Sequence, residues 1–303
     1  MCFAQSPAPL VSNDPDVTQR TPEAARDANT RSVRRALIIC GLAGDAEHRE
    51  LFAGTLESIH AGLTTRLGFA AENVRVLWGD EPTDEDPAAV RASRSVAGRE
   101  TITQAAEALR GELQPDDVLW VFVLGHAYYD GRHSWLNVGG PDLHQIELGQ
   151  LFGGVQCREQ VFLITTPCSG FFLKPLAMPG RIVISATEPD LEVNETLFPY
   201  KLAEAFSSPP PAGEIDLDQD QRVTLLDLYL WTARETAQQY ATDELLATEH
   251  ALLDDSGDGR GTEIQADYLP EELGGRRRAN RPPPPLAGDG KLAQQIVLPW
   301  IEK

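Results

Sequence analysis

The sequence predicts an α/β protein, a three-layer α/β/α sandwich on a mostly parallel sheet, with a C-terminal helical extension. Residues 117–124 form an unbroken apolar run that ends at Gly125 and His126, which is typical of a strand covered on both faces. Strand and helix patterns alternate over residues 33–208, as in right-handed βαβ units. Apolar residues then recur at steps of three and four over residues 223–240, which predicts one long amphipathic helix.

Taken in order, the chain begins with a polar arm at residues 1–32, rich in Pro, Asp and Thr, which we expect to be disordered. Within the α/β domain, apolar runs predict five strands, and residues with helical spacing predict four helices. A loop is expected at 79–97, and residues 135–138 are expected to form half of a hairpin. An acidic loop and the long helix, within residues 209–273, are expected to pack on the domain, and residues 274–303 form an extended tail whose apolar end is expected to tuck against the body. The strands are predicted at 34–40, 73–78, 117–124, 159–165 and 181–187, and the helices at 51–67, 98–113, 142–152 and 195–206.

Composition limits the classes of partner. The 303 residues carry 46 acidic and 26 basic side chains, a formal net charge of -20, which argues against nucleic acid and anionic membranes as partners. The four cysteines lack paired spacing, so a disulfide framework or a zinc ribbon is not expected. No apolar run approaches the ~20 residues that span a bilayer. The compartment stays open between a bacterial cytoplasm and, if a signal peptide preceded Gln5, the periplasm or the exterior.

Two predicted strand ends carry groups that could react together. One strand is followed by Gly125-His126, and the strand at 159–165 is followed by Pro167-Cys168-Ser169. If these strands are neighbours in a parallel sheet, His126 and Cys168 lie on the same edge. A thiol beside an imidazole is the minimum for nucleophilic catalysis, because the imidazole supports the thiolate and later protonates the leaving group. Taken alone, each residue would more simply be a buried core side chain.

The order of these motifs resembles the caspase–haemoglobinase fold, most closely legumain-type cysteine peptidases and their bacterial caspase-like relatives. The resemblance covers roughly residues 34–206 and rests on Gly-His, on Cys near Ser-Gly, and on the following Ser185-Ala186-Thr187. It implies that His126 and Cys168 are the catalytic pair and that the N–H of Ala127 stabilises the oxyanion. It also implies that Ser185, Ala186 and Thr187 line the substrate cleft, and that an arginine shortly after the first strand, here Arg49, holds the substrate's side chain.

The chain departs from this pattern at the nucleophile. Legumain-type enzymes carry Cys-x-Ser-Gly, whereas Ser169 follows Cys168 directly here. Alignment on Ser169-Gly170 places Pro167 at the nucleophile position, and Cys168 would then point away from His126. A one-residue bulge would restore the pair. Two functions therefore remain open: a cysteine-type endopeptidase acting on peptide or protein substrates, and a catalytically degenerate domain that serves as a binding or structural module.

An acidic segment ahead of the long helix has the spacing of a calcium loop. Oxygen ligands at positions 1, 3, 5, 9 and 12 fall on Asp216, Asp218, Asp220, Thr224 and Asp227, and a helix follows, as calcium loops require. Gln221 replaces the usual turn glycine. The alternative is an acidic helix N-terminus favoured by the helix dipole. A second acidic segment, at 254–263, has alternate oxygen ligands and could equally be a plain turn. Calcium is the cofactor to test, and the proposed peptidase chemistry requires none.

Overall fold

A computed structural model describes Met1 and residues 32–190, 192–278 and 281–299. The arm predicted at residues 1–32 therefore lies almost wholly outside the described residues. Contacts divide the chain into one unit at Met1–Arg31 and a compact unit at Ser32–Lys303. The helices and strands of the described residues all lie in the compact unit. It is an α/β structure in which a mostly parallel sheet lies between two helical layers, as the sequence predicted.

The central sheet has seven strands in the order β10-β9-β8-β4-β1-β2-β3. Neighbouring strands run parallel except β10, which pairs antiparallel with β9 at one edge. The strands are β1 (Arg34–Cys40), β2 (Val74–Trp78), β3 (Arg94–Val96), β4 (Val118–Leu124), β8 (Glu159–Ile164), β9 (Arg181–Ser185) and β10 (Leu252–Asp254). The apolar run at residues 117–124 forms β4. This strand lies between β1 and β8, and every residue in it is buried.

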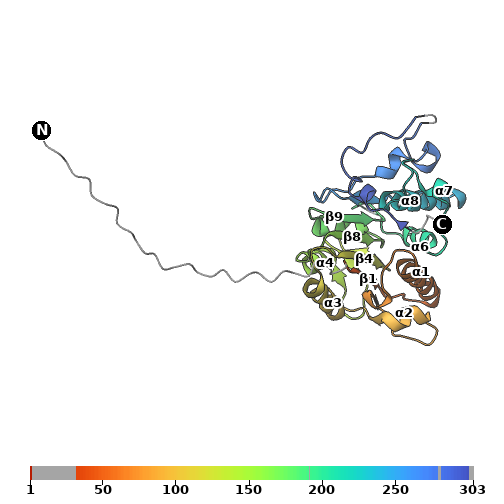
Figure 1. The fold of residues 1–303 in the computed structure, drawn as a ribbon. Coiled ribbons are helices and arrows are strands. Elements are labelled where there is room, and N and C mark those ends of the chain that lie inside the picture. The colour runs from red at the N-terminus through yellow and green to blue at the C-terminus, as the bar shows by residue number, and fades with distance from the viewer. Residues whose placement is uncertain (2–31, 191, 279–280, 300–303) are drawn as a thin grey trace. The chain divides into compact units, whose positions relative to one another are not determined.

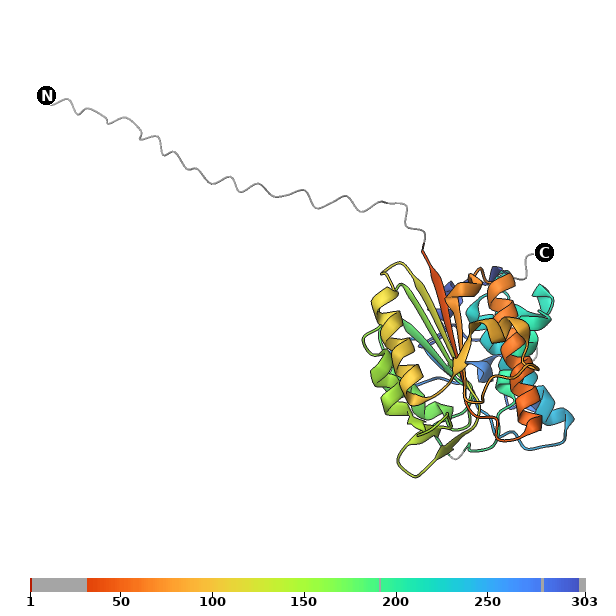
Figure 2. The ribbon, with the colours of Figure 1, turned by 90° about the horizontal axis from the view of Figure 1, so that it is seen from below.

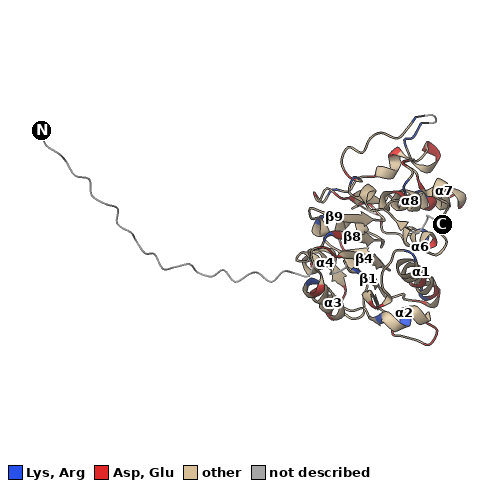
Figure 3. Cartoon of the chain, in the orientation of Figure 1, with Lys and Arg blue, Asp and Glu red and all other residues tan. Residues whose placement is uncertain are grey.

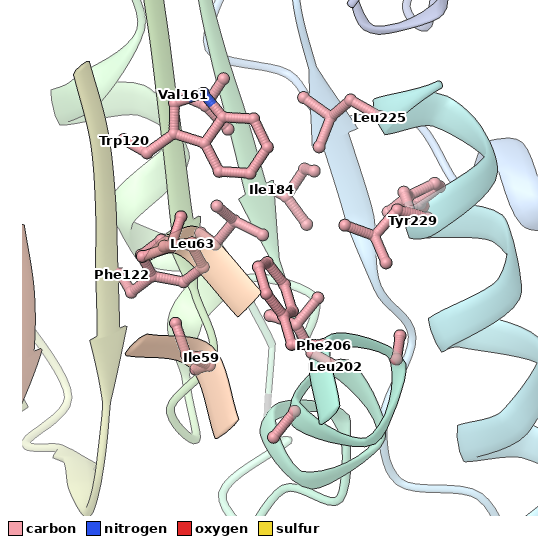
Figure 4. Close-up of a cluster of buried hydrophobic side chains, with 14 of the residues drawn as sticks. Ile59, Leu63, Trp120, Phe122, Val161, Ile184, Leu202, Phe206, Leu225 and Tyr229 are labelled. Atoms are coloured by element: carbon pink, nitrogen blue, oxygen red, sulfur yellow. The ribbon is translucent and has the colours of Figure 1, made fainter. Parts of the chain in front are cut away.

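Side chains of β4 alternate between two cores because successive residues of a strand point to opposite faces. Trp120 and Phe122 enter the core beneath α1, α6 and α8, whereas Leu119, Val121 and Val123 enter the core beneath α3, α4 and α5. Figure 4 shows the first core, in which strand side chains face those of the three helices. Phe122 and Phe206 meet edge to face with 6.0 Å between ring centroids.

Helices cover both faces of the sheet (Figures 1 and 2). One layer holds α1 (Ala46–Thr65), α2 (Ala88–Ser93), α6 (Phe198–Ser207) and α8 (Leu225–Thr242), and the other holds α3 (Arg99–Glu112), α4 (Gln145–Phe152) and α5 (Leu173–Leu176). Their starts have local causes. Asp45 accepts a hydrogen bond from the backbone N–H of His48 at the start of α1, and Thr224 forms a capping box with Asp227 at the start of α8.

Shorter elements complete the unit. A second sheet, in the order β5 (Ala127–Tyr129), β6 (Ser134–Leu136) and β7 (Leu143–His144), follows β4 and contains the predicted hairpin strand. The single-turn helices are η1 (Ala71–Asn73), η2 (Ser169–Phe172), α7 (Ala212–Ile215), η3 (Ile264–Asp267), η4 (Glu271–Leu273) and η5 (Ala293–Gln295).

The prediction of a plain loop at 79–97 was wrong, because α2 and β3 lie there. Charged residues and two prolines dominate this stretch, so it lacks a periodic apolar signal. Buried Val90 nevertheless anchors α2, and three residues of β3 add an edge strand beside β2.

The described part of the tail packs on the body, while Trp300 and Ile301 of the predicted apolar end lie outside the described residues. Leu225 donates its backbone N–H to the carbonyl oxygen of Ile296, and Leu298 donates to Val223. Many charged side chains lie on helices and loops (Figure 3), whereas Arg181 of β9 and Asp254 of β10 are buried in the sheet. None of the helices in the described ranges is both long enough and apolar enough to cross a membrane.

Candidate functional site

The carboxyl ends of β1, β4 and β8 meet at one edge of the sheet, which we call the rim. Gly41 follows β1 there and donates its N–H to the carbonyl oxygen of Leu124. Gly125, which follows β4, has φ +116°, and a Cβ atom at that position would lie 2.8 Å from the Gly41 nitrogen. Only glycine fits this close approach. The close approach of these two glycines thus places His126 at the rim.

His126 is held by the backbone and by a second histidine. Its Nε2 lies 3.0 Å from the carbonyl oxygen of Ala43. A carbonyl oxygen only accepts hydrogen bonds, so Nε2 carries the proton and Nδ1 is the nitrogen that could act as a base. The His48 ring meets the His126 ring edge to face, with 4.6 Å between centroids, and Phe52 packs at 5.4 Å.

His48 links two carboxylates at the rim. Its Nδ1 lies 2.8 Å from Asp45 Oδ2, its Nε2 lies 3.0 Å from Glu195 Oε2, and the Tyr200 hydroxyl donates to Glu195 at 2.7 Å. The bonds to Glu195 and Asp45 raise the pKa of His48. Burial and the bond to Glu195 raise the pKa of Tyr200. This group was not predicted from the sequence, because Glu195 and Tyr200 lie far along the chain and only the Asp45–His48 spacing carries a local signal.

Cys168 is enclosed by the protein. Its side chain has no exposed surface, and its backbone is left-handed, with φ 54° and ψ 23°. Its N–H donates to the carbonyl oxygen of Glu192 at 3.0 Å. Burial raises the pKa of the thiol to about 11, which is opposite to the shift that activates a catalytic cysteine. Within the described part of the chain, no hydrogen bond joins the Cys168 thiol to the His126 ring, whose Nε2 bonds Ala43 instead.

Ser169 connects the Cys168 turn to the end of β9. Its hydroxyl oxygen accepts the N–H groups of Ala186 and Thr187, each at 3.0 Å, and lies 3.1 Å from the Thr187 hydroxyl. The Ser185 hydroxyl donates to the carbonyl oxygen of Thr187. The predicted cleft-lining residues Ser185, Ala186 and Thr187 are therefore fully buried, and the polar side chains among them bond within the protein.

The two other predicted substrate-binding residues also have internal partners. Ala127 begins β5 and lies opposite Leu136 in the small sheet. The guanidinium of Arg49 pairs with Asp80 at 3.0 Å and with Asp86 at 2.8 Å, and it lies over the Trp78 ring. The resemblance assigned the Arg49 guanidinium to binding the substrate's side chain. In the structure, Asp80 and Asp86 of the same chain already pair with it.

The acidic loop before α8 brings three of its five predicted ligands together. Carboxylate oxygens of Asp216, Asp218 and Asp227 all lie within 4.8 Å of one another. Asp227 is fully buried, and burial together with Asp218 and Asp216 raises its pKa to about 7, although bonds from Thr224 favour the charged form. Asp220 pairs with the Arg222 guanidinium instead. Thr224 donates its hydroxyl to Asp227 at 2.7 Å and caps the helix. The three converging oxygens suit a hard cation such as calcium.

The second acidic segment has its carboxylates bonded to backbone N–H groups. Asp254 accepts from Gly257 and Gly259, and Asp255 accepts from Gly290, Leu292 and Ala293. Asp289 in turn accepts from Asp255 and Ser256. These bonds tie β10 to the tail, which supports the plain-turn interpretation.

A mainly apolar groove of about 840 Å³ lies beside the Cys168 turn. We call it the rim groove; its lining includes Phe171, Leu173, Pro189, Leu252 and, as charged groups, Lys174, Glu188 and Arg260. Tyr129 of the small sheet stacks on Phe171 with 4.3 Å between centroids and 6° between planes. The preceding residue of β5, Tyr128, stacks on Trp135 with 6.5 Å between centroids and is 44% exposed. The size and apolar character of the groove fall within the range of ligand sites.

Comparisons with known proteins give little. No family model matches the chain, and no curated protein matches it. Among solved structures, the crystal structure of protein GSU0716 from Geobacter sulfurreducens is similar to 57% of this chain and 81% of its own, with 16% identity and a TM-score of 0.39. A similarity this low carries no argument about function.

Proposed function

We propose that this protein is a catalytically degenerate member of the caspase-like class that binds a peptide segment of a partner without cleaving it. One observation carries the proposal: the Cys168 thiol has no exposed surface, and burial raises its pKa to about 11. At neutral pH such a thiol is almost entirely protonated, and the thiolate is the nucleophile of cysteine peptidases.

The local backbone supports the same conclusion. The left-handed conformation of Cys168 is uncommon for a residue with a side chain. Two sets of hydrogen bonds hold it in place: the bond from the Cys168 N–H to Glu192, and the bonds that the hydroxyl of the next residue, Ser169, accepts from Ala186 and Thr187. Pro167, which precedes it, has no reactive group and is buried as well. The rim therefore keeps a histidine without supplying a nucleophile to it.

The rim groove supports peptide binding. Its apolar lining and the stacked pair Tyr129–Phe171 offer burial to side chains of a partner. The groove lining carries both signs of charge, with the basic residues Lys174 and Arg260 and the acidic residue Glu188. Opposite charges in one groove can set the direction of a bound peptide.

A peptide array incubated with the full-length protein tests the proposal. We expect wild-type protein to bind a subset of peptides and to leave them intact by mass spectrometry. Phe171→Ala should weaken that binding by about tenfold or more, because it removes an aromatic anchor. Leu51→Ala is the matched control, since Leu51 is an exposed apolar residue on α1 outside the groove.

Two outcomes separate the alternatives. Cleavage of bound peptides that stops in Cys168→Ala and in His126→Ala would establish a peptidase and end the proposal. Binding that Phe171→Ala leaves unchanged would remove the rim groove as the site.

We also propose that the loop Asp216–Asp227 binds calcium. The convergence of three carboxylates, with Arg222 engaged by Asp220 at the loop's edge, supports it. The ion would be held by Asp216, Asp218 and Asp227 and would offset their mutual repulsion at the start of α8. Its role would be structural, because Gln294 of the tail also reaches Asp218 at 2.7 Å.

A further inference from the structure

A separate, partly open pocket of about 200 Å³ lies against α8, and we call it the α8 pocket. One wall is the small-residue face of the helix, with Ala233, Ala237 and Ala241; other walls come from the chain at 245–251 and from η3 and η4. Because one water occupies about 30 Å³ in the liquid, the space equals about six or seven waters, or one long side chain.

A hydroxyl group in this pocket lacks a partner. Thr236 is 3% exposed, and its Oγ1 makes no hydrogen bond within the described residues. Thr232, one turn earlier, satisfies its own hydroxyl by donating to the carbonyl oxygen of Leu228 at 2.7 Å. Buried hydroxyls without partners are rare in folded proteins. The Thr236 oxygen is therefore available to a donor group that enters the pocket.

The pocket is also acidic. Glu249, Glu263 and Glu272 are among its lining residues, and Lys and Arg are absent from that lining. His250, the remaining ionisable base there, is engaged by Glu192. Glu263 faces Glu188 at the end of β9, and this contact, followed by burial, raises the pKa of Glu188 to about 7. The His250 imidazole also acts on Glu188 and Glu263, and a cation bound at Glu263 would further offset the repulsion between these carboxylates.

The arrangement favours an organic cation over a metal ion. Glu249 already accepts hydrogen bonds from the N–H groups of Leu197 and Phe198 and from the Tyr240 hydroxyl. Among the described residues, the metal-type cluster of carboxylates is the one at Asp216–Asp227. The alanine wall suits the methylene groups of an alkyl chain. Leu245 and Leu246, 61% and 87% exposed, stand beside the pocket as further apolar surface.

We propose that the α8 pocket binds a primary ammonium or guanidinium group carried on a short aliphatic chain. The alkyl part lies along Ala233 and Ala237, while the cationic head reaches the Thr236 hydroxyl and the Glu263 carboxylate. This ligand chemistry belongs both to a basic side chain of a partner and to a free amine. The inference does not rest on the rim groove or on the state of Cys168.

Calorimetric titration of the full-length protein with n-butylamine, agmatine and a blocked arginine tripeptide tests the proposal, with n-butanol as the uncharged control. We expect the amines to bind and butanol to bind at least about tenfold more weakly. Stronger binding of the tripeptide than of agmatine would assign the pocket to a partner's side chain, and the reverse order would assign it to a free amine.

Variants locate the binding. Ala237→Leu should fill the pocket and abolish binding of agmatine, while Thr236→Val and Glu263→Gln should each weaken it by about fivefold or more. Glu204→Gln, an exposed carboxylate on α6 outside the pocket, should change nothing. Circular dichroism confirms that each variant is folded. Equal binding of butanol and butylamine, or agmatine affinity unchanged in folded Ala237→Leu, would overturn the proposal.

Discussion

The backbone N–H of Cys168 donates to the carbonyl oxygen of Glu192, with 3.0 Å between nitrogen and oxygen. This bond ties the turn after β8 to the segment after β9, and it fixes Cys168 in a left-handed conformation with its side chain inside the protein. The His126 ring, on the same rim, packs against His48. The two residues that the sequence paired thus belong to different local structures.

Ser169→Ala should destabilise the protein. The substitution leaves the buried N–H of Thr187 without its acceptor and leaves the N–H of Ala186 with the carbonyl oxygen of Ile164 alone. An unsatisfied buried group costs about 1–3 kcal/mol. We expect the free energy of unfolding in urea to fall by roughly 1–3 kcal/mol. Ser207→Ala, whose exposed hydroxyl bonds the carbonyl oxygen of Glu204, is the control and should change it by less than about 0.5 kcal/mol. Equal effects of the two would show that Ser169 does not fasten the turn.

Stability should fall as the pH rises from about 5 to 8. Burial raises the pKa of Glu249 to about 7, although bonds from Leu197, Phe198 and Tyr240 favour its charged form. The folded protein therefore binds a proton that the unfolded chain releases above pH 4.5, and this stabilisation is lost as the pH rises through 7. His48 and His250, whose pKa values their carboxylate partners raise, act in the same direction.

Glu249→Gln tests the origin of this pH dependence. The variant cannot titrate, so the melting temperature should vary less between pH 5 and 8 than in wild type, with the difference corresponding to at most about 3 kcal/mol. Glu204→Gln, on the surface of α6, should retain the wild-type profile. A wild-type profile in Glu249→Gln would assign the pH dependence to other groups.

Calcium should raise the melting temperature. A cation that binds only the folded state stabilises it by mass action, so about 1 mM calcium should shift the transition by several degrees if the site has an affinity typical of sensor loops. Asp218→Asn should abolish the shift while leaving the helix cap of Asp227 in place. Asp243→Asn, at the far end of α8, should keep the shift. An equal shift in Asp218→Asn and wild type would remove Asp218 from the site.

The fold followed from the sequence because the sheet strands are long, buried runs. Strand β4 and its neighbours are apolar on both faces, and this pattern permits little else. Edge strands β3 and β10 were missed, since each has three residues and the burial of β10 depends on contacts with β9 and with the tail.

Only part of the candidate site could be predicted from the sequence. The apolar strand before His126 was enough to predict that this residue lies at the rim. The burial of Cys168 depends on its left-handed backbone and on its partner Glu192, and no local sequence pattern specifies either. The same holds for Glu195, which reaches His48 from across the rim. Local spacing did identify the converging carboxylates of Asp216, Asp218 and Asp227, because the three residues lie on one continuous segment.

Reactivity of the Cys168 thiol tests the central claim most directly. The native full-length protein is alkylated with iodoacetamide at neutral pH, and the rate at Cys168 is followed by peptide mass mapping beside the rate in urea. A shift of the thiol pKa to about 11 lowers its thiolate fraction by about 100-fold, so we predict that native Cys168 reacts at least about 100 times more slowly than the unfolded chain and equally slowly in His126→Ala. A native rate above that of the unfolded chain, reduced in His126→Ala, would contradict the account and establish a working thiol–imidazole pair.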